Sequence, residues 1–212
     1  LLKLKLDLHV HTTRSHDAFT ESSNLAFLSK ARGLDGLAIT DHNTPTTDPP
    51  DGLIVVPGIE VSSNQGHVIG LGISAPVTRG FSADRTIDEI HRLGGVAVIP
   101  HPYDLFRSSV RPDQLKVRPD AIEVVNSSSF LHSVTWKRAR EFVEKARLSA
   151  VAGSDSHIPQ TLGRAFTFVE TNSSDAESIL DAIRKGAVSP AGRPIRATER
   201  LRKLVLSGTR RR

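Results

Sequence analysis

Histidine and carboxylate side chains stand at or beside the ends of five apolar segments that have the length of strands. His9 and His11 close the first segment, and Asp155 and His157 follow the last. Residues two apart in an extended chain point to the same side, so each pair can reach one metal ion or two adjacent ions. Imidazole and carboxylate suit zinc, manganese or iron, so the spacing predicts a metal site. The residues of these types at the other three segments are Asp41, His42, Glu60 and His101, and His67 opens one further segment.

Short apolar runs alternate with amphipathic segments and predict the elements that position these side chains. Alternating strands and helices indicate an α/β domain with a mostly parallel sheet, and the number of strands favours a closed barrel. In a parallel barrel the carboxyl ends of the strands share one face, so residues from 9 to 157 are expected to converge on one pocket. Strands are expected over residues 3–10, 36–40, 53–61, 67–73, 96–100, 121–125, 148–152 and 165–170, and helices over 22–32, 82–93, 133–146, 175–185 and 196–206.

The composition excludes several other kinds of site. The chain has no cysteine, which rules out thiolate zinc sites, disulfide frameworks and cysteine nucleophiles. No apolar run approaches the roughly 20 residues that span a bilayer. Residues 1–8 alternate lysine with leucine and do not have the pattern of a signal peptide. These features predict a cytoplasmic protein with no membrane partner, and they leave the oligomeric state open.

Positive charge is concentrated at the C-terminal end. The whole chain carries a formal net charge of +5, yet residues 191–212 contain eight Lys and Arg residues against one acid, Glu199. The rest of the chain is therefore slightly acidic. A basic segment of this kind is typical either of a solvated helix with a frayed end or of contact with nucleic acid or another polyanion.

Five short motifs follow one another along the chain. In this order they resemble the motifs of the PHP superfamily, the polymerase and histidinol phosphatase type, over about residues 3–190. The resemblance implies an α/β fold, a distorted (β/α)7 TIM-like barrel, over residues 1–190, followed by a basic C-terminal helix and tail over 191–212. The motifs are Asp7-Leu8-His9-Val10-His11-Thr12, Thr40-Asp41-His42, Gly58-Ile59-Glu60, Ile99-Pro100-His101-Pro102 and Gly153-Ser154-Asp155-Ser156-His157.

The resemblance also implies a ligand set for two or three divalent transition metals, which would be Zn, Mn or Fe. In the loop after the first strand, Ser15-His16-Asp17 fits the family pattern with Asp17 as the ligand and His16 out of register. The implied ligands are His9, His11, Asp17, His42, Glu60, His67, His101, Asp155 and His157.

A metal cluster of this kind predicts phosphate-ester hydrolysis by a metal-activated water. His16, Asp41 and His157 are the candidate catalytic side chains. Arginine matches the geometry of phosphate, and Arg14, Arg107 and Arg164 lie on or next to the motif loops. The expected substrate is a small phosphorylated molecule or a nucleic-acid end.

Two departures from the family pattern leave the substrate open. Only 34 positions separate His67 from His101, so the helical insert of some nucleotide phosphatases is absent, and Tyr103-Asp104 follows His101-Pro102 in place of Gly-Arg. A phosphomonoesterase acting on a nucleotide or small phosphate is the preferred prediction. The alternatives are a 5′–3′ exonuclease for short RNA or DNA, an amide or ester hydrolase, and a non-catalytic PHP-like nucleic-acid-binding module. Amidohydrolases bridge two metals with a lysine at a strand end, and no lysine stands at such a position here. This disfavours the amide or ester hydrolase.

Overall fold

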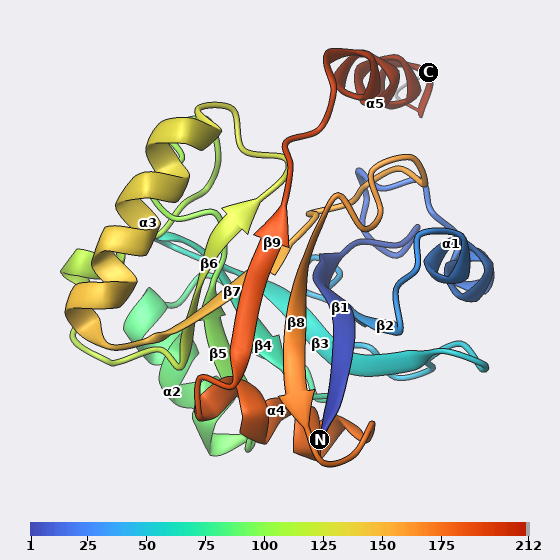
Figure 1. Ribbon diagram of the computed structural model, residues 1–212. Coiled ribbons are helices and arrows are strands. Elements are labelled where there is room, and N and C mark those ends of the chain that lie inside the picture. The colour runs from blue at the N-terminus through green and yellow to red at the C-terminus, as the bar shows by residue number, and fades with distance from the viewer. Residues whose placement is uncertain (211–212) are drawn as a thin grey trace.

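Nine strands form one sheet that curls into a nearly closed, distorted barrel (Figure 1). The protein is seen in a computed structural model that describes residues 1–210. The strands are β1 Leu2–Val10, β2 Gly36–Ile39, β3 Ile54–Ser63, β4 Gly66–Leu71, β5 Val96–Ile99, β6 Ala121–Asn126, β7 Ser149–Gly153, β8 Ala165–Thr171 and β9 Val188–Gly192. The helices are α1 Leu25–Ala31, α2 Ala83–Arg92, α3 His132–Ala146, α4 Ala176–Arg184 and α5 Ala197–Arg210, with short 3-10 helices at Ser22–Asn24 and Pro112–Gln114.

The strand order is β7-β6-β5-β4-β3-β2-β1-β8-β9. At the opening of the barrel the Thr167 hydroxyl of β8 donates to the Ala152 carbonyl of β7 at 2.9 Å and accepts from the Ala152 N–H at 2.8 Å, and an isolated parallel bridge joins Val10 of β1 to Ser156 just after β7. The expected distorted α/β barrel is therefore confirmed, with nine strands in place of seven.

The expectation of a mostly parallel sheet was wrong. The pairs β1–β2, β2–β3, β5–β6 and β6–β7 are parallel, whereas β3–β4, β4–β5, β1–β8 and β8–β9 are antiparallel. The physical reason is clearest between β3 and β4, which are joined by Asn64 and Gln65 alone. A parallel pair requires a crossover of a dozen or more residues, so a connection this short forces a hairpin.

Strand β9 was not predicted from the sequence. Its five residues include Pro190, which cannot donate to a sheet and so disfavours a strand prediction. In the structure β9 pairs with β8 alone, at the edge of the sheet, where a proline is tolerated. The boundary expected at residue 190 falls within this strand.

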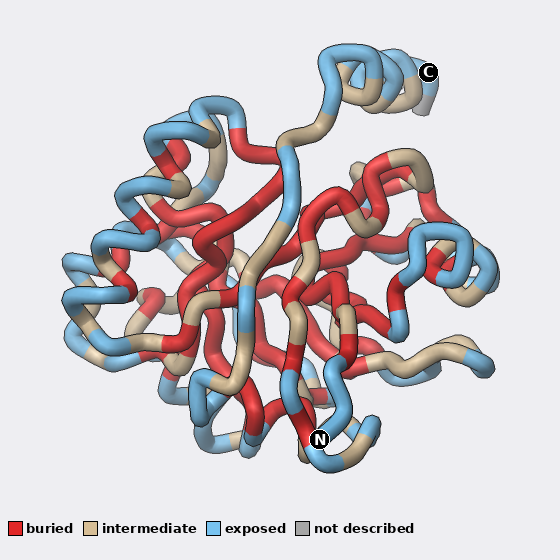
Figure 2. Tube along the Cα trace, viewed as in Figure 1, coloured by how far each residue is buried: buried red, intermediate tan, exposed pale blue. Residues whose placement is uncertain are grey.

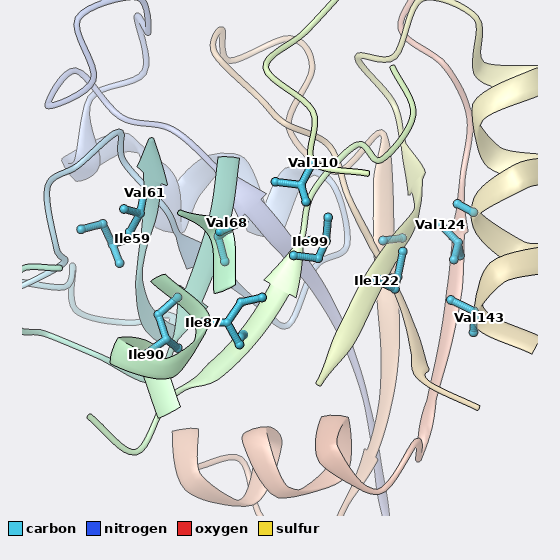
Figure 3. Close-up of a cluster of buried hydrophobic side chains, with 14 of the residues drawn as sticks. Ile59, Val61, Val68, Ile87, Ile90, Ile99, Val110, Ile122, Val124 and Val143 are labelled. Atoms are coloured by element: carbon cyan, nitrogen blue, oxygen red, sulfur yellow. The ribbon is translucent and has the colours of Figure 1, made fainter. Parts of the chain in front are cut away.

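The core packs between the strands and the helices that cover them. In β1, Lys3 is exposed and Lys5 half-buried, but every residue from Leu6 to Val10 is buried, so this end of the strand has no solvent face. Helices α2 and α4 begin at the capping side chains of Ser82 and Asp175, which accept hydrogen bonds from N–H groups in the first turn. The apolar cluster in Figure 3 joins α2 and α3 to the strands through Ile59, Val61, Val68, Ile87, Ile90, Ile99, Val110, Ile122, Val124 and Val143.

Helix α5 stands apart from this core. It lies beyond the end of the barrel at which β6 and β9 finish, and its surface is largely exposed (Figures 1 and 2). Leu201, Leu204 and Val205 are all exposed. Arg211 and Arg212, the last two residues of the predicted basic tail, lie outside the described residues. Among residues 1–210, no helix combines the length and the apolar character required to cross a membrane.

Candidate metal centre

One end of the barrel gathers the side chains that the sequence places at strand ends. β1 delivers His9 and, just beyond its end, His11, while β3 and β4 carry Glu60 and His67. The backbone continues the pairing past β2, where His42 forms an isolated parallel bridge with Glu60. The loops after β5 and β7 supply His101, Asp155 and His157. Residues far apart in sequence thus meet because neighbouring strand ends share one edge of the sheet.

Two of these residues have a left-handed backbone. His101 has φ 34° and Asp155 has φ 53°, a region that residues other than glycine rarely adopt. Each residue follows its strand closely, so the turn redirects the chain where its side chain enters the cluster. Left-handed residues of this kind cost roughly 1–3 kcal/mol each and gather at functional sites.

Glu60 lies at the centre of the cluster. Its side chain is 1% exposed, and five imidazole rings approach its two oxygens to within 3.5 Å. Oε1 lies 3.0 Å from His67 Nδ1, 3.3 Å from His101 Nε2 and 3.5 Å from His9 Nε2, and Oε2 lies 3.0 Å from His42 Nδ1 and 3.4 Å from His11 Nε2. A carboxylate with imidazoles around both oxygens offers two ligand atoms among five histidine donors.

Asp155 and Asp17 add two more carboxylates. Asp155 Oδ1 lies 3.2 Å from His157 Nδ1 and 3.6 Å from His11 Nε2. Asp17 Oδ2 lies 3.0 Å from His157 Nε2, and Asp17 Oδ1 lies 3.7 Å from His42 Nε2. His157 therefore stands between the two carboxylates.

The donor set fits divalent metal ions. Asp17 Oδ1, His42 Nδ1, His67 Nδ1 and Asp155 Oδ1 are all buried without a hydrogen-bond partner. A buried polar atom left in this state costs about 1–3 kcal/mol, and a bound cation would satisfy all four. Three sets of donor atoms lie within 4.8 Å of one another, which are His11, His42 and His157, then His9, His11 and Glu60, then His42, Glu60 and His67.

The electrostatics of the cluster favour the charged forms of Glu60 and Asp155 and the neutral form of His11, while neighbouring carboxylates outweigh burial and raise the pKa of His9, His67 and His157. Burial by itself would raise the pKa of Glu60, but His67 and His9 outweigh it and hold that pKa well below the usual range. Burial also opposes the charge on Asp155, and Arg107 and His9 lower its pKa in the same way. Burial and the neighbouring His157 together lower the pKa of His11, so His11 is the neutral imidazole that metals bind.

A pocket of about 490 Å³ opens above the cluster. Its floor consists of seven of the nine predicted ligands, all but His9 and His11. Its rim is different in character, since it combines apolar and cationic side chains from the loops after β5 and β6 and from α5. The rim residues are Leu105, Phe106, Arg107, Ser108, Phe130 and Lys203.

Known proteins resemble this chain in sequence and in fold. A family model described as PHP-associated matches residues 136–188. A solved two-domain protein from Bacteroides vulgatus that contains a predicted PHP-like metal-dependent phosphoesterase has a TM-score of 0.71 at 18% identity, over 97% of this chain and 70% of that one. An uncharacterized protein from Methanocaldococcus jannaschii is 31% identical over 141 residues, which are 58% of this chain and 82% of the relative. The chain belongs to the PHP superfamily. A probable phosphatase from Shewanella frigidimarina is 27% identical over 225 residues, which are 85% of this chain and 90% of the relative.

Glu123 is a residue of this PHP domain that the sequence analysis missed. It is buried in β6, and its Oε1 lies 3.1 Å from His9 Nδ1. Its Oε2 accepts hydrogen bonds from the His101 N–H at 2.8 Å and from Asn126 Nδ2 at 2.9 Å. A carboxylate behind a ligating imidazole fixes the orientation of the ring and raises its basicity. The available signal was the single acid within the apolar run 121–125, because a buried charge requires partners.

The three predicted catalytic residues lie in different environments in the PHP structure. His157 lines the pocket, whereas His16 is exposed, with its ring centroid 5.8 Å from that of His42. Asp41 is buried and does not line the pocket. Its Oδ1 accepts from the Thr12 N–H and the Ser15 hydroxyl, both at 2.7 Å, and its Oδ2 accepts from the Thr12 hydroxyl at 2.6 Å. Through these bonds Asp41 holds the loop after β1 in place, which is a structural role.

The three predicted phosphate-binding arginines also lie in different environments. Arg107 lines the pocket and forms an ion pair with Asp155. Arg164 is buried and pairs instead with Glu199 of α5, which turns it away from the metal cluster. Arg14 is exposed and lies outside the pocket lining. Sequence proximity to a motif therefore brought one arginine of the three to the pocket.

Asp7 ties the first PHP motif to the last one. It is fully buried, and its oxygens accept hydrogen bonds from the N–H groups of Ser154 at 2.8 Å, Gly163 at 2.9 Å and His9 at 3.3 Å. Burial raises the pKa of Asp7 to about 6. The side chain thereby fixes β1 against the loop that carries Asp155.

Gly153 permits a close approach beneath the cluster and carries a first prediction. A Cβ added there would lie 2.3 Å from His9 Cβ, 2.8 Å from His9 N and 2.7 Å from Glu123 Oε1. Gly153→Ala should therefore lower the free energy of unfolding by about 1–3 kcal/mol, the cost of overpacking, and should weaken metal binding by displacing His9. Urea unfolding and elemental analysis would measure both effects. Gly208→Ala is the control, since nothing lies within 4 Å of an added Cβ there, and equal stability of the two variants would contradict the packing argument.

Proposed function

We propose that this protein is a metal-dependent phosphoesterase that hydrolyses a phosphomonoester, a nucleotide or another small phosphate. The observation that carries the proposal is a cluster of six histidines and three carboxylates, buried or half-buried, seven of which form the floor of an open pocket. In the proposal these residues hold two or three divalent ions of Zn, Mn or Fe. The proposed ligands are His9, His11, Asp17, His42, Glu60, His67, His101, Asp155 and His157.

The ions, when bound, would supply an activated water and stabilise charge on the phosphoryl oxygens. The chain's own residues would do the positioning. The planar Arg107 guanidinium at the rim offers paired N–H donors to phosphoryl oxygens. Glu123 holds the His9 ring through Nδ1. His157 lines the pocket and His16 does not, but His157 is also a proposed ligand, so its role would be to hold an ion and not to donate a proton.

The apolar part of the rim supports a substrate with more than a phosphate group. Phe106 and Phe130 are 65% and 53% exposed, and their ring centroids lie 5.4 Å apart beside the pocket. Stacking of a base on an aromatic ring contributes about 1–3 kcal/mol. This pair favours a nucleotide over a compact sugar phosphate.

A nuclease acting on the end of a short RNA or DNA is the second candidate. The observation that favours it is the basic helix α5 beside the mouth of the pocket, where Lys203 is part of the lining. Cations next to an open site attract a polyanion as well as a single phosphate.

A substrate panel tests the proposal. Protein purified without chelator and supplemented with zinc or manganese should release inorganic phosphate from at least one of a chromogenic monoester, histidinol phosphate, nucleoside monophosphates and nucleoside bisphosphates. Chelation should abolish the release, and readdition of metal should restore it. Faster release of mononucleotides from 5′-phosphorylated oligonucleotides would favour the nuclease. Turnover of an amide or carboxylic ester without turnover of any phosphate ester would reject both candidates.

A further inference from the structure

The C-terminal helix α5 is fastened to the rim of the metal pocket. Glu199 forms an ion pair with the buried Arg164, and its other oxygen accepts a hydrogen bond from the Arg196 N–H at 2.8 Å. Just before the helix, the Ile195 N–H donates to the Ser127 carbonyl at 2.9 Å. These contacts hold the first turn of α5 against the ends of β6 and β8.

Arg200 extends this attachment to the rim itself. Its two terminal nitrogens donate to the carbonyls of Ser128 at 3.1 Å and Ser129 at 2.7 Å. Its guanidinium also lies 4.3 Å from the ring centroid of Phe130, one of the rim aromatics. A planar guanidinium that donates to two carbonyls and stacks on a ring has a defined orientation. The next turn of α5 is consequently placed over the pocket.

Lys203 occupies that next turn and faces the cluster. It lines the pocket, its side chain is 31% exposed, and its Nζ lies 3.4 Å from Asp17 Oδ2. Arg107 lines the same pocket and pairs with Asp155, so two cations stand at the rim opposite the floor of proposed ligands. Metal ions bound by Asp17 and Asp155 would compete for these carboxylates, which would leave both cations available to an anion in the pocket.

We propose that Lys203 binds the phosphoryl group of the substrate, which makes α5 part of the active site. This inference rests on the proposed phosphoesterase function. A lysine ammonium carries three donors and acts on phosphate as a point charge, complementing the bidentate Arg107. The metal-lined floor and the two cations would then contact different oxygens of one phosphoryl group.

The test compares three variants of the full chain. Lys203→Ala removes the charge, Lys203→Arg keeps it, and Arg202→Ala removes one charge from the exposed neighbouring position of the same helix. Metal content by elemental analysis, affinity for inorganic phosphate by calorimetry, and kcat and KM for the best monoester are measured for each. Lys203→Ala should bind phosphate roughly 10-fold or more weakly and raise KM by a similar factor, with unchanged metal content. Lys203→Arg should recover most of the loss, and Arg202→Ala should match the wild-type protein.

Three outcomes would overturn the inference. Phosphate affinity and KM of Lys203→Ala within about twofold of wild type would show that Lys203 does not touch the phosphoryl group. Loss of metal in Lys203→Ala would assign Lys203 to support of Asp17, and failure of wild-type metal-loaded protein to bind phosphate would leave no anion site. By contrast, wild-type protein that binds phosphate but hydrolyses no ester would reject the proposed function while the binding comparison still decides the role of Lys203.

Discussion

Glu60→Gln is expected to remove more than half of the bound metal while leaving the barrel folded. Five imidazoles surround the two oxygens of Glu60, so a neutral amide would remove the one charge shared by both sides of the cluster. The substitution also turns one acceptor oxygen into a donor that cannot ligate a cation. Metal content should fall to less than half of the wild-type value. Turnover of the best phosphate ester should fall at least about 100-fold, because bound metal contributes several kcal/mol to the transition state.

The matched control is Glu144→Gln, which makes the same chemical change on the exposed surface of α3. This variant should retain its metal and its activity. Circular dichroism should give the same spectrum for both variants and the wild type, since Glu60 accepts no hydrogen bond from the backbone through its side chain among those found within residues 1–210. Wild-type metal content in Glu60→Gln would mean that the ions do not depend on this carboxylate, and the proposed role of Glu60 as a ligand would be wrong.

Glu123→Gln is expected to weaken metal binding without removing a ligand. Glu123 holds His9 through Oε1, and it accepts from the His101 backbone and from Asn126 through Oε2. An amide can supply one acceptor to these partners but not two, so either the His9 ring or the His101 loop loses its support. Changes to such supporting groups typically reduce metal affinity or activity by 10–100-fold.

Competition with a chromogenic chelator would measure that affinity for wild type, Glu123→Gln and the exposed control Glu170→Gln on β8. The expected signature is a metal content that is near normal at saturating metal and low at limiting metal. This pattern separates Glu123 from Glu60, whose variant should remain deficient at saturation. An unchanged affinity for Glu123→Gln would show that the His9 ring is held well enough by its other neighbours.

The sequence by itself determined the cluster at the end of the barrel. His9 and His11 lie at the end of β1, where the two-residue period of an extended chain puts them on one side, whereas Asp155 and His157 follow β7 in a turn in which Asp155 has φ 53°. The motif register also selected Asp17 over His16, and the structure brings Asp17 to the cluster and leaves His16 exposed. Local periodicity and motif order suffice for this result, because barrel topology carries strand ends to one edge regardless of the details of packing.

Only the tertiary structure decided which of the remaining polar residues face the pocket. Sequence proximity placed Asp41, Arg14 and Arg164 beside the motifs, but Asp41 braces a loop and Arg164 pairs with Glu199. Glu123 and Lys203 reach the site from segments without a motif. Their roles depend on contacts between distant parts of the chain.

The strand directions and the place of α5 were also decided in three dimensions. The two-residue turn before β4 and the edge position of β9 produce a mixed sheet, although the succession of strands and helices favours a parallel one. The sequence of helix α5 is typical of a solvated basic tail, and in the structure Leu201, Leu204 and Val205 are indeed exposed. Glu199 and Arg200 nevertheless attach the helix to the rim of the pocket. Its position is set by a few polar contacts over long sequence separations, and such contacts leave no periodic trace in the sequence.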